Sequence, residues 1–371
     1  MLRMIKGRHA AGALALAVAL GCAACSGAAA ESTGGQRATP ASSQTSPTRA
    51  AESSSPPPPP TTISIAFGGD VHFEGMLGSR LAADPDTALG PVASILSSAD
   101  LAMVNLETAI TTRGTPEPKG FTFRAPTTAF QALRAAGVDV TTMANNHGMD
   151  FGLVGLQDSV AAITASGFPV VGIGLDDAHA YAPHYATVKG VRVGFVGATQ
   201  VLDDPLIPKW TAGPGKPGLA SAKEVDRTVR AVQEARRNAD VVVVYLHYGT
   251  ETVNCPTDRQ QSIATTLAAA GADLIVGSHA HVLLGAGFMG RTYVDYGLGN
   301  FAFYSSGSGP NTQSGVLVVK VQPHKVVRAG WVPAHIEGGV PIPLQGSAVA
   351  PALANWDSLR GCTHLSATPP R

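Results

Sequence analysis

Apolar runs of strand length alternate along this chain with segments whose apolar residues recur at helical spacing. Runs rich in β-branched residues predict strands, and apolar residues three or four positions apart predict helices. The predicted strands span residues 63–67, 101–104, 138–143, 169–171, 241–246 and 273–276, and the predicted helices span 91–99, 126–136, 153–166, 222–238 and 259–270. The alternation predicts an α/β fold in which buried strands pair in parallel.

Other segments depart from this alternation. Residues 202–219 are rich in Pro, Gly and Asp, which predicts an irregular surface loop. Further strands are predicted at 185–189 and 191–196, which flank Gly190 as a hairpin, and at 293–296, 315–321 and 326–332, which suit antiparallel pairing. We find no internal repeat and no domain break after Thr62, so residues 63–340 are predicted to form one domain, followed by a C-terminal tail at 341–371.

Five polar motifs stand at or just beyond the ends of apolar runs. They are Asp70-Val71-His72, Asn105-Leu106-Glu107, Asn145-Asn146-His147, His247 and Gly277-Ser278-His279-Ala280-His281, and they hold five of the eleven histidines. Ligands of open α/β sheets bind beyond the carboxyl ends of the strands, so these motifs are expected on one rim. Imidazole nitrogens with carboxylate and amide oxygens suit a divalent ion such as Zn, Mn or Fe. Two ions about 3.5–4 Å apart would clamp an in-line displacement and activate water at neutral pH.

Some of these polar residues have a plainer interpretation. Glu107 is either a metal ligand or an acid that interacts with a helix dipole. Asn145 is expected to support its loop, and Asp150 and Glu251 to be structural or exposed at the rim. Asn300 either bonds the backbone of its own turn or points into the site.

The overall composition excludes some classes of partner. The chain has 371 residues, its charged content is 14% and its formal net charge is zero. Its size suits one large α/β domain or two small ones. The charge balance gives no overall footprint for nucleic acid or for an anionic membrane surface.

The N-terminus has the features of an export signal. Three basic residues precede an apolar stretch at 10–20, which is shorter than the roughly 20 residues of a membrane-spanning helix. The stretch ends in Val18-Ala19-Leu20-Gly21-Cys22, which resembles a bacterial lipobox with Cys22 as the lipidated residue. Cys25 is a second candidate, and an ordinary cleaved signal is the alternative. We therefore expect a signal peptide at 1–22 and an outward-facing membrane lipoprotein.

Residues 23–62 are predicted to be a disordered linker. They are rich in Ser, Thr, Ala and Pro, have almost no large apolar residue and include five consecutive prolines at 56–60. Such a segment buries too little apolar surface to fold, and the prolines favour extended polyproline II. In an exported protein the remaining cysteines, Cys255 and Cys362, are expected to form a disulfide; two free thiols are the alternative.

The motifs together resemble the CapA family of capsule or poly-γ-glutamate synthesis proteins, which is related to the calcineurin-like metallophosphoesterases. The resemblance covers about residues 63–336. It rests on Gly69-Asp70, Asn105-Leu106-Glu107, Ala144-Asn145-Asn146-His147 with Asp150-Phe151-Gly152, Leu246-His247-Tyr248-Gly249, Gly277-Ser278-His279-Ala280-His281 and Tyr296-Gly297-Leu298-Gly299-Asn300-Phe301.

This resemblance implies a four-layer α/β/β/α sandwich of metallophosphoesterase type with two metal ions. Position by position, one ion would take Asp70, His72 and His281, and the other Asn146, His247 and His279. His147 would be the general acid or oxyanion stabiliser. Metallophosphoesterases carry a bridging Asp in a Gly-Asp motif where this chain has Asn105-Leu106-Glu107, so Glu107 would bridge with a longer side chain.

The implied function is synthesis, export or anchoring of an anionic polymer such as poly-γ-glutamate, through a hydrolase-like site that would cleave a phosphoester or amide bond. The implied partners are that polymer or a phosphoester substrate, the membrane through the lipid anchor, and a membrane synthase complex. The alternatives are a non-catalytic polymer-binding accessory protein and a general extracellular metallophosphoesterase. Nucleic acid is not expected as a partner.

Overall fold

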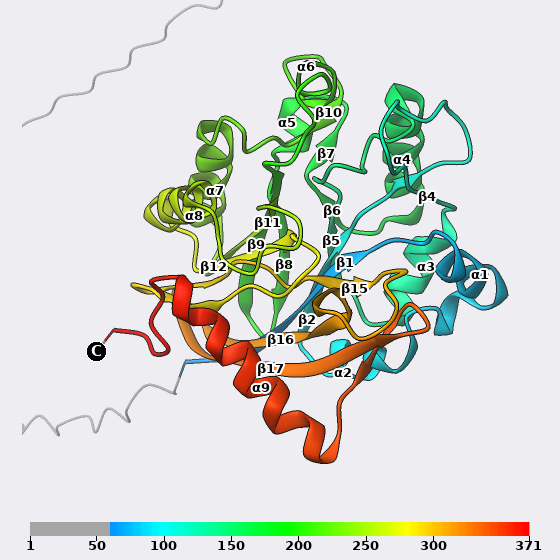
Figure 1. Cartoon of the computed structure of the whole chain (residues 1–371). Coiled ribbons are helices and arrows are strands. Elements are labelled where there is room, and N and C mark those ends of the chain that lie inside the picture. Colours follow the sequence, from blue (N-terminus) through cyan, green and yellow to red (C-terminus); the bar gives the residue numbers. More distant parts are fainter. Residues whose placement is uncertain (1–59, 371) are drawn as a thin grey trace, which may run out of the picture. The chain divides into compact units, whose positions relative to one another are not determined.

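Two β-sheets lie face to face at the centre of the computed structural model, which describes residues 60–370 (Figure 1). The first sheet has the order β18-β17-β16-β1-β2-β5-β6, with β15 paired to β1. Its strands are β1 (Ile63–Val71), β2 (Leu101–Leu106), β5 (Val140–Thr142), β6 (Val170–Val171), β15 (Asn300–Ala302), β16 (Gln313–Gln322), β17 (Lys325–Glu337) and β18 (Val340–Pro343). β1, β2, β5 and β6 pair in parallel, whereas β16 to β18 are antiparallel, as the sequence predicts.

The second sheet has the order β13-β14-β12-β11-β9-β8. Its strands are β8 (His184–Val188), β9 (Val191–Thr199), β11 (Val241–Tyr248), β12 (Leu274–His279), β13 (Ala286–Met289) and β14 (Thr292–Asp295). The four central strands are parallel. The antiparallel pair β8–β9 confirms the hairpin predicted around Gly190.

Helices cover the outer faces of both sheets. Those against the first sheet are α1 (Met76–Ala83), α2 (Ala93–Leu96), α3 (Thr128–Ala135) and α4 (Gly152–Ser166), and those against the second are α7 (Asp226–Asn238) and α8 (Asp258–Ala270). Phe67 of β1 meets Phe195 and Tyr245 of the second sheet in the inner core. This layer order confirms the predicted α/β/β/α sandwich.

The same local interaction is found at the start of four of the parallel strands. An aspartate stands directly before β2, β5, β11 and β12, and its carboxylate accepts the backbone N–H of a residue in the neighbouring strand. The four bonds are Ser64 to Asp100, Ala102 to Asp139, Arg192 to Asp240 and Val242 to Asp273, each 2.8 Å long. Each aspartate fixes its strand's register against that neighbour, so the opposite, carboxyl ends of the strands are also aligned.

Residues 202–219 are not simply an exposed loop. They form α6 (Ile207–Trp210) and β10 (Gly218–Leu219), which pairs with β7 (Ile173–Gly174). Leu206 and Trp210 are buried in the core beneath the first sheet's helices. The Pro, Gly and Asp content predicted turns, which are present. It gave no sign that apolar residues between the turns would be buried.

The C-terminal residues fold against the domain. Strand β18 takes in residues 341–343, and α9 (Val349–Ser358) places Trp356 in a stack on Trp331, with ring centroids 5.6 Å apart. Cys362 forms a disulfide with Cys255 of the loop after β11. The segment expected as a tail is therefore bound to the domain by a helix and a covalent bond.

The remaining elements are short. They are β3 (Ala109–Ile110), β4 (Arg124–Ala125), α5 (Asp177–Ala180) and the 3-10 turns at Pro85–Thr87, Gly90–Val92, Pro310–Thr312, Gly346–Ala348 and Leu359–Cys362. None of the helices within residues 60–370 has the length and apolarity to cross a membrane. The predicted signal peptide, Cys22, Cys25 and almost all of the predicted linker lie outside the described residues.

Candidate metal centre

The five motifs meet where the carboxyl ends of the two sheets face each other. Asp70 and Glu107 come from the ends of β1 and β2 in the first sheet, and His247 and His279 from β11 and β12 in the second. The backbone N–H of His279 donates to Oδ2 of Asp70 at 3.1 Å and so joins the sheets at the site. The expected single rim exists, but two sheets form it.

A glycine allows this close approach. A Cβ atom on Gly69 would lie 1.9 Å from the carbonyl oxygen of Gly299, so any other residue would push the β15 segment away from Asp70. The backbone N–H of Asp70 donates to the same carbonyl at 3.0 Å.

Two overlapping groups of side chains have the geometry of metal ligands. Asp70, Glu107 and His247 form one group, and Glu107, His279 and His281 form the other, with the ligand atoms of each group within 4.8 Å of one another. Glu107 belongs to both. It is the side chain that the two groups share, and its role as a bridging ligand stays a prediction.

The electrostatics of the centre favour a bound cation. Neither carboxylate oxygen of Glu107 has a hydrogen-bond partner among the described residues, and the same holds for Nδ1 of His279. Burial, and then the charge of Asp70, raise the pKa of Glu107 well above its ordinary value. Burial lowers the pKa of His279 to about 3, which keeps the ring neutral and able to bind metal. Unpartnered buried acceptors are costly, so the residues fit a divalent ion.

Amide side chains orient two of the candidate ligands. Nδ2 of Asn105 donates to Oδ1 of Asp70 at 2.8 Å, and Asn145 in turn donates to Asn105 at 2.9 Å. Asn145 is thus a supporting residue, as expected. Oδ1 of Asn300 lies 2.8 Å from Nδ1 of His281, and its Nδ2 donates to the carbonyl of Asn311. Asn300 therefore faces the site, one of the two possibilities the sequence left open, and the backbone group that it bonds belongs to the later turn at Pro310–Thr312 and not to its own.

His247 is held between residues of both sheets. Its Nε2 lies 2.7 Å from Oδ1 of Asn146, and its Nδ1 lies 3.2 Å from the hydroxyl of Ser278. Burial lowers its pKa well below the ordinary value. Asn146 thus contacts the centre through His247, and its own role as a ligand stays a prediction.

His147 faces the centre with one nitrogen and a buried acid with the other. Its Nδ1 lies 2.5 Å from Oδ2 of Asp150, and its Nε2 lies 3.7 Å from Oε1 of Glu107. Asp150 also accepts from Nζ of Lys119 at 2.8 Å. Burial lowers the pKa of His147 despite the opposing effect of Asp150. Asp150 is fully buried, so it is structural but not exposed at the rim.

Lys119 and Phe123 are site residues that the sequence analysis missed. Lys119 also donates to the carbonyl of Asn146. Phe123 stacks on His147 at a centroid distance of 4.0 Å, and its N–H donates to Oδ2 of Asp150 at 2.6 Å. Asp150 lies three residues after His147, a helical-turn spacing that sequence reading can use. The loop that carries Lys119 and Phe123 has no comparable signal.

His72 lies beside the centre but belongs to neither group. Its ring stacks on the other face of Phe123 at 4.6 Å. Its Nδ1 accepts the N–H of Glu74 at 3.0 Å, and its Nε2 lies 3.3 Å from the backbone nitrogen of Tyr304. The structure thus places His72 in an aromatic wall with both nitrogens facing backbone donors, and its predicted role as a metal ligand stays untested.

The turn that carries two of the ligands is conformationally unusual. His279 and His281 have φ angles of 96° and 56°, in the left-handed region that non-glycine residues rarely adopt. Such conformations cost about 1–3 kcal/mol each and persist where the surroundings impose them. Here the backbone N–H of Thr252 donates to the carbonyl of Ala280 at 2.8 Å and holds the turn from the side.

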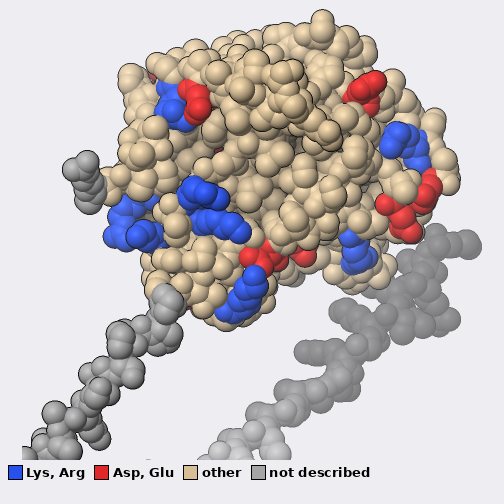
Figure 2. Space-filling model, turned by 90° about the horizontal axis from the view of Figure 1, so that it is seen from below, with Lys and Arg blue, Asp and Glu red and all other residues tan. Residues whose placement is uncertain are grey.

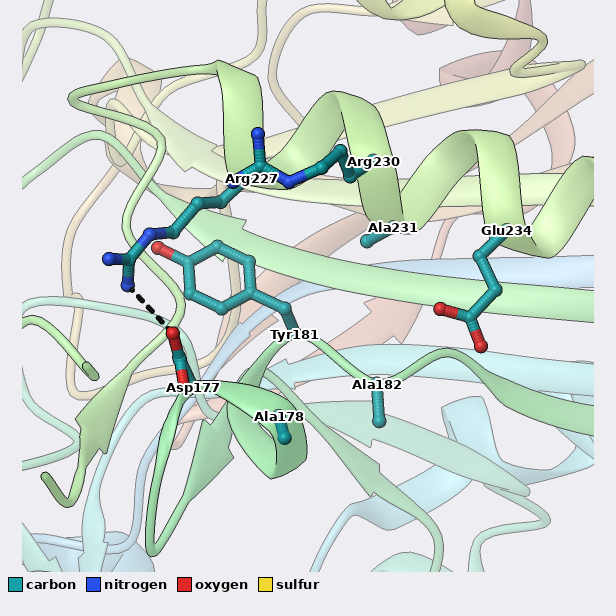
Figure 3. Close-up of a pocket in the computed structure, with 8 residues that line it drawn as sticks. All are labelled: Asp177, Ala178, Tyr181, Ala182, Arg227, Arg230, Ala231 and Glu234. Atoms are coloured by element: carbon teal, nitrogen blue, oxygen red, sulfur yellow. Dashed lines mark ion pairs between the residues drawn. The ribbon is translucent and has the colours of Figure 1, made fainter. Parts of the chain in front are cut away.

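A separate pocket lies between α5 and α7 (Figure 3). It measures about 320 Å³, and none of the candidate ligands lines it. Arg227 crosses it to pair with Asp177 at 3.3 Å. Since its charges are of both signs, we assign it no ligand.

The fold and the centre define a four-layer α/β protein with a buried cluster of carboxylates and histidines, a candidate metal site, at its strand ends. The chain belongs to the family described as bacterial capsule synthesis protein PGA_cap, whose model matches residues 64–305, more than half of the chain. This span includes every candidate ligand from Asp70 to His281.

Curated relatives carry related names. The chain is 32% identical over 217 residues to the PGA biosynthesis protein CapA of Bacillus subtilis, covering 58% of this chain and 55% of the relative. It is 30% identical over 192 residues to a probable polyglutamine synthesis accessory protein of Mycobacterium tuberculosis, covering 50% of each. The chain thus spans about half the length of the curated relatives it matches.

Solved structures with a similar arrangement are more distant. A hypothetical protein from Thermus thermophilus has a TM-score of 0.47 at 18% identity, covering 74% of this chain and 100% of that one. A putative 5'-nucleotidase from Staphylococcus aureus has a TM-score of 0.46 at 16% identity, covering 80% and 58%.

Proposed function

We propose that this chain is an exported, membrane-anchored protein that acts in the synthesis, export or anchoring of an anionic polymer such as poly-γ-glutamate. We further propose that its metal centre cleaves a phosphoester or amide bond. The observation that carries the proposal is that Glu107, with two unpartnered buried oxygens, is shared by both ligand groups. The family and the names of the relatives support the role in capsule polymer.

The residues divide the work of such a site. Asp70, Glu107, His247, His279 and His281 would hold one or two divalent ions, with Mn, Zn and Fe suited to this donor set. A bound divalent ion supplies Lewis acidity, which polarises the bond to be cleaved.

His147 is the proposed general acid. Asp150 accepts the proton on Nδ1, so the protonated form of the ring would donate from Nε2, which already faces the ligand groups. Phe123 and Asp150 hold the ring in this orientation from its face and its edge. Lys119 neutralises part of the charge on Asp150.

Metal analysis and hydrolysis, measured on the same preparation, test the proposal. The purified full chain is loaded with Mn or Zn and assayed on an aryl phosphoester and on a γ-glutamyl oligomer. We expect bound metal and hydrolysis, both lost in His279→Ala and Glu107→Gln, and both kept in the exposed control His364→Ala. Absence of bound metal after loading would overturn the metal centre.

The other outcomes identify the alternatives. Bound metal without hydrolysis, together with normal polymer production by cells that carry His279→Ala, would favour an accessory protein. Hydrolysis of phosphoesters alone, with polymer production unchanged, would favour a general phosphoesterase. The anchor is tested separately: Cys22→Ala should release the protein from the membrane fraction, and continued retention would refute Cys22 as the anchor.

A further inference from the structure

Four basic side chains lie at the end of the domain opposite the metal centre. Lys320 and Arg328 are cross-strand partners in β16 and β17, Lys325 stands at the turn between them, and Arg291 stands at the turn between β13 and β14. We call these four residues the basic face. None of them forms an ion pair with any other described residue, although many cations elsewhere in the domain do.

The basic face includes a pocket whose chemistry suits an anion. The pocket measures about 400 Å³ and is lined by Arg291, His324 and Lys325 together with apolar and proline residues, and none of the described residues that line it carries a carboxylate. Nearby acids are engaged elsewhere. The carboxylate of Asp240 accepts the backbone N–H of Arg192, Asp273 is paired with Arg236, and Asp357 is paired with Arg360. Figure 2 shows several Lys and Arg side chains at the left of the view, with Asp and Glu side chains elsewhere on the same face.

The described chain begins within this face. Oγ1 of Thr62 accepts from the side-chain amide of Gln322 at 2.9 Å, and Ser64 is the strand partner of Lys320. Strands rise about 3.3 Å per residue and Ser64 stands six residues before Asp70, so the face lies roughly 20 Å from Asp70 along β1. The chain that leads to Cys22 therefore joins the domain at the end that carries unpaired cations, and the metal centre is at the other end.

We propose that the basic face rests on the phosphate headgroups of anionic phospholipids and so orients the metal centre away from the membrane. The inference rests on the proposed lipid anchor, which would bring this end of the domain to the bilayer. The zero net charge of the chain conceals the feature. The aspartates before β2, β5, β11 and β12 stand at this same end, but each accepts a backbone N–H of a neighbouring strand, and two of them pair with Lys189 and Arg236. Attraction between exposed charges and an anionic bilayer acts within a Debye length, about 10 Å at 0.1 M salt, so the contact is sensitive to salt.

Vesicle binding tests the proposal without metal or acylation. The full chain carrying Cys22→Ser and Cys25→Ser is sedimented in EDTA with phosphatidylcholine vesicles that contain phosphatidylglycerol, and with vesicles of phosphatidylcholine alone. We expect binding only to the anionic vesicles, weakened by added salt. Lys325→Glu with Arg328→Glu should weaken it at least about tenfold. The control, Lys209→Glu with Arg230→Glu, reverses two exposed cations outside the face and should bind like the parent chain.

Several results would overturn the proposal. These are no binding to anionic vesicles at low salt, equal binding to both vesicle types, or an equal loss in the control variant. Binding of poly-γ-glutamate that requires Lys325 and Arg328, without vesicle binding, would assign the face to the polymer instead. Since the assay contains no metal and no substrate, failure of the proposed hydrolysis leaves its result unchanged. Failure of the anchor appears separately, in the membrane fractionation of Cys22→Ala.

Discussion

Oε1 of Glu107 lies 3.5 Å from Nε2 of His247, although the two residues belong to different sheets. Glu107 follows β2 and is held by its backbone N–H, which donates to Val71 at 2.7 Å. His247 lies near the end of β11. The contact exists only because the inner core brings the carboxyl ends of both sheets together. The geometry of the metal centre therefore depends on how the two sheets pack.

The first prediction concerns Glu107 as the shared ligand. Adding Mn should raise the melting temperature of the full chain, because an ion that binds only the folded state stabilises it. Glu107→Gln should remove this rise, since a neutral amide replaces the one carboxylate common to both ligand groups. Thermal unfolding with and without Mn is the measurement. Glu251→Gln changes an exposed rim acid and should keep the rise. A normal rise in Glu107→Gln would contradict the shared role.

The second prediction separates His72 from the ligands. Both nitrogens of His72 face backbone nitrogens, whereas Nδ1 of His279 has no partner among the described residues. His72→Phe keeps the stack on Phe123, so we expect Mn affinity to stay within about threefold, or less than about 1 kcal/mol. His279→Ala should lower the affinity at least about tenfold. Calorimetric titration measures both. Equal losses in the two variants would make His72 a ligand after all.

The third prediction concerns the disulfide as a brace for the histidine turn. The loop that carries Cys255 holds Ala280 through Thr252, and Asn254 donates to Leu283 at 3.0 Å. Replacing both cysteines by serine removes a link between residues 107 apart. The chain-entropy model then predicts a loss of stability of about 4–5 kcal/mol.

Because the left-handed turn needs external support, the double serine variant should also bind Mn more weakly. Urea unfolding and calorimetry measure the two effects. Trp356→Ala is the control: it loosens the C-terminal helix from Trp331 but leaves the Cys255 loop linked. It should cost about 3–5 kcal/mol without weakening Mn binding. If Mn affinity falls equally in both variants, general destabilisation is the cause and the brace is refuted.

The fourth prediction concerns the buried acid Asp295. Burial raises its pKa from 3.8 to about 8. Between these two values the folded state holds a proton that the unfolded state has released. The stability from this proton is therefore full below about pH 4 and is lost as pH rises through about 8, by at most about 1.4 kcal/mol per pH unit.

Asp295→Asn removes this titration, and its amide oxygen can still accept the N–H of Gly297, now 3.0 Å from Oδ1. Urea unfolding in EDTA from about pH 5 to about pH 9 should show a smaller loss for the variant than for the parent chain. Asp204→Asn changes an acid whose side chain is 93% exposed and should follow the parent. Identical pH profiles for parent and Asp295→Asn would contradict the buried proton.

Local sequence patterns predicted most of the long strands and helices. The valine-rich run before His247 and the helical spacing of 259–270 became β11 and α8 with boundary shifts of one or two residues. The helix predicted at 222–238 begins only at Asp226. Strand β15 was missed because it has only three residues, too few to show a periodic pattern. It exists through its pairing with the end of β1. Short elements depend on their partners, which periodicity does not specify.

The sequence by itself determined the element order, the polar motifs at the strand ends and the residue types of a metal centre, because these follow from short-range periodicity and chemistry. Only the tertiary structure decided that two facing sheets share the rim, that Glu107 belongs to both ligand groups, and that His72 turns its nitrogens to backbone donors. It also decided that Lys119 and Phe123 reach His147. These relations join residues far apart in the chain, so the packing of the sheets decides them and local pattern cannot.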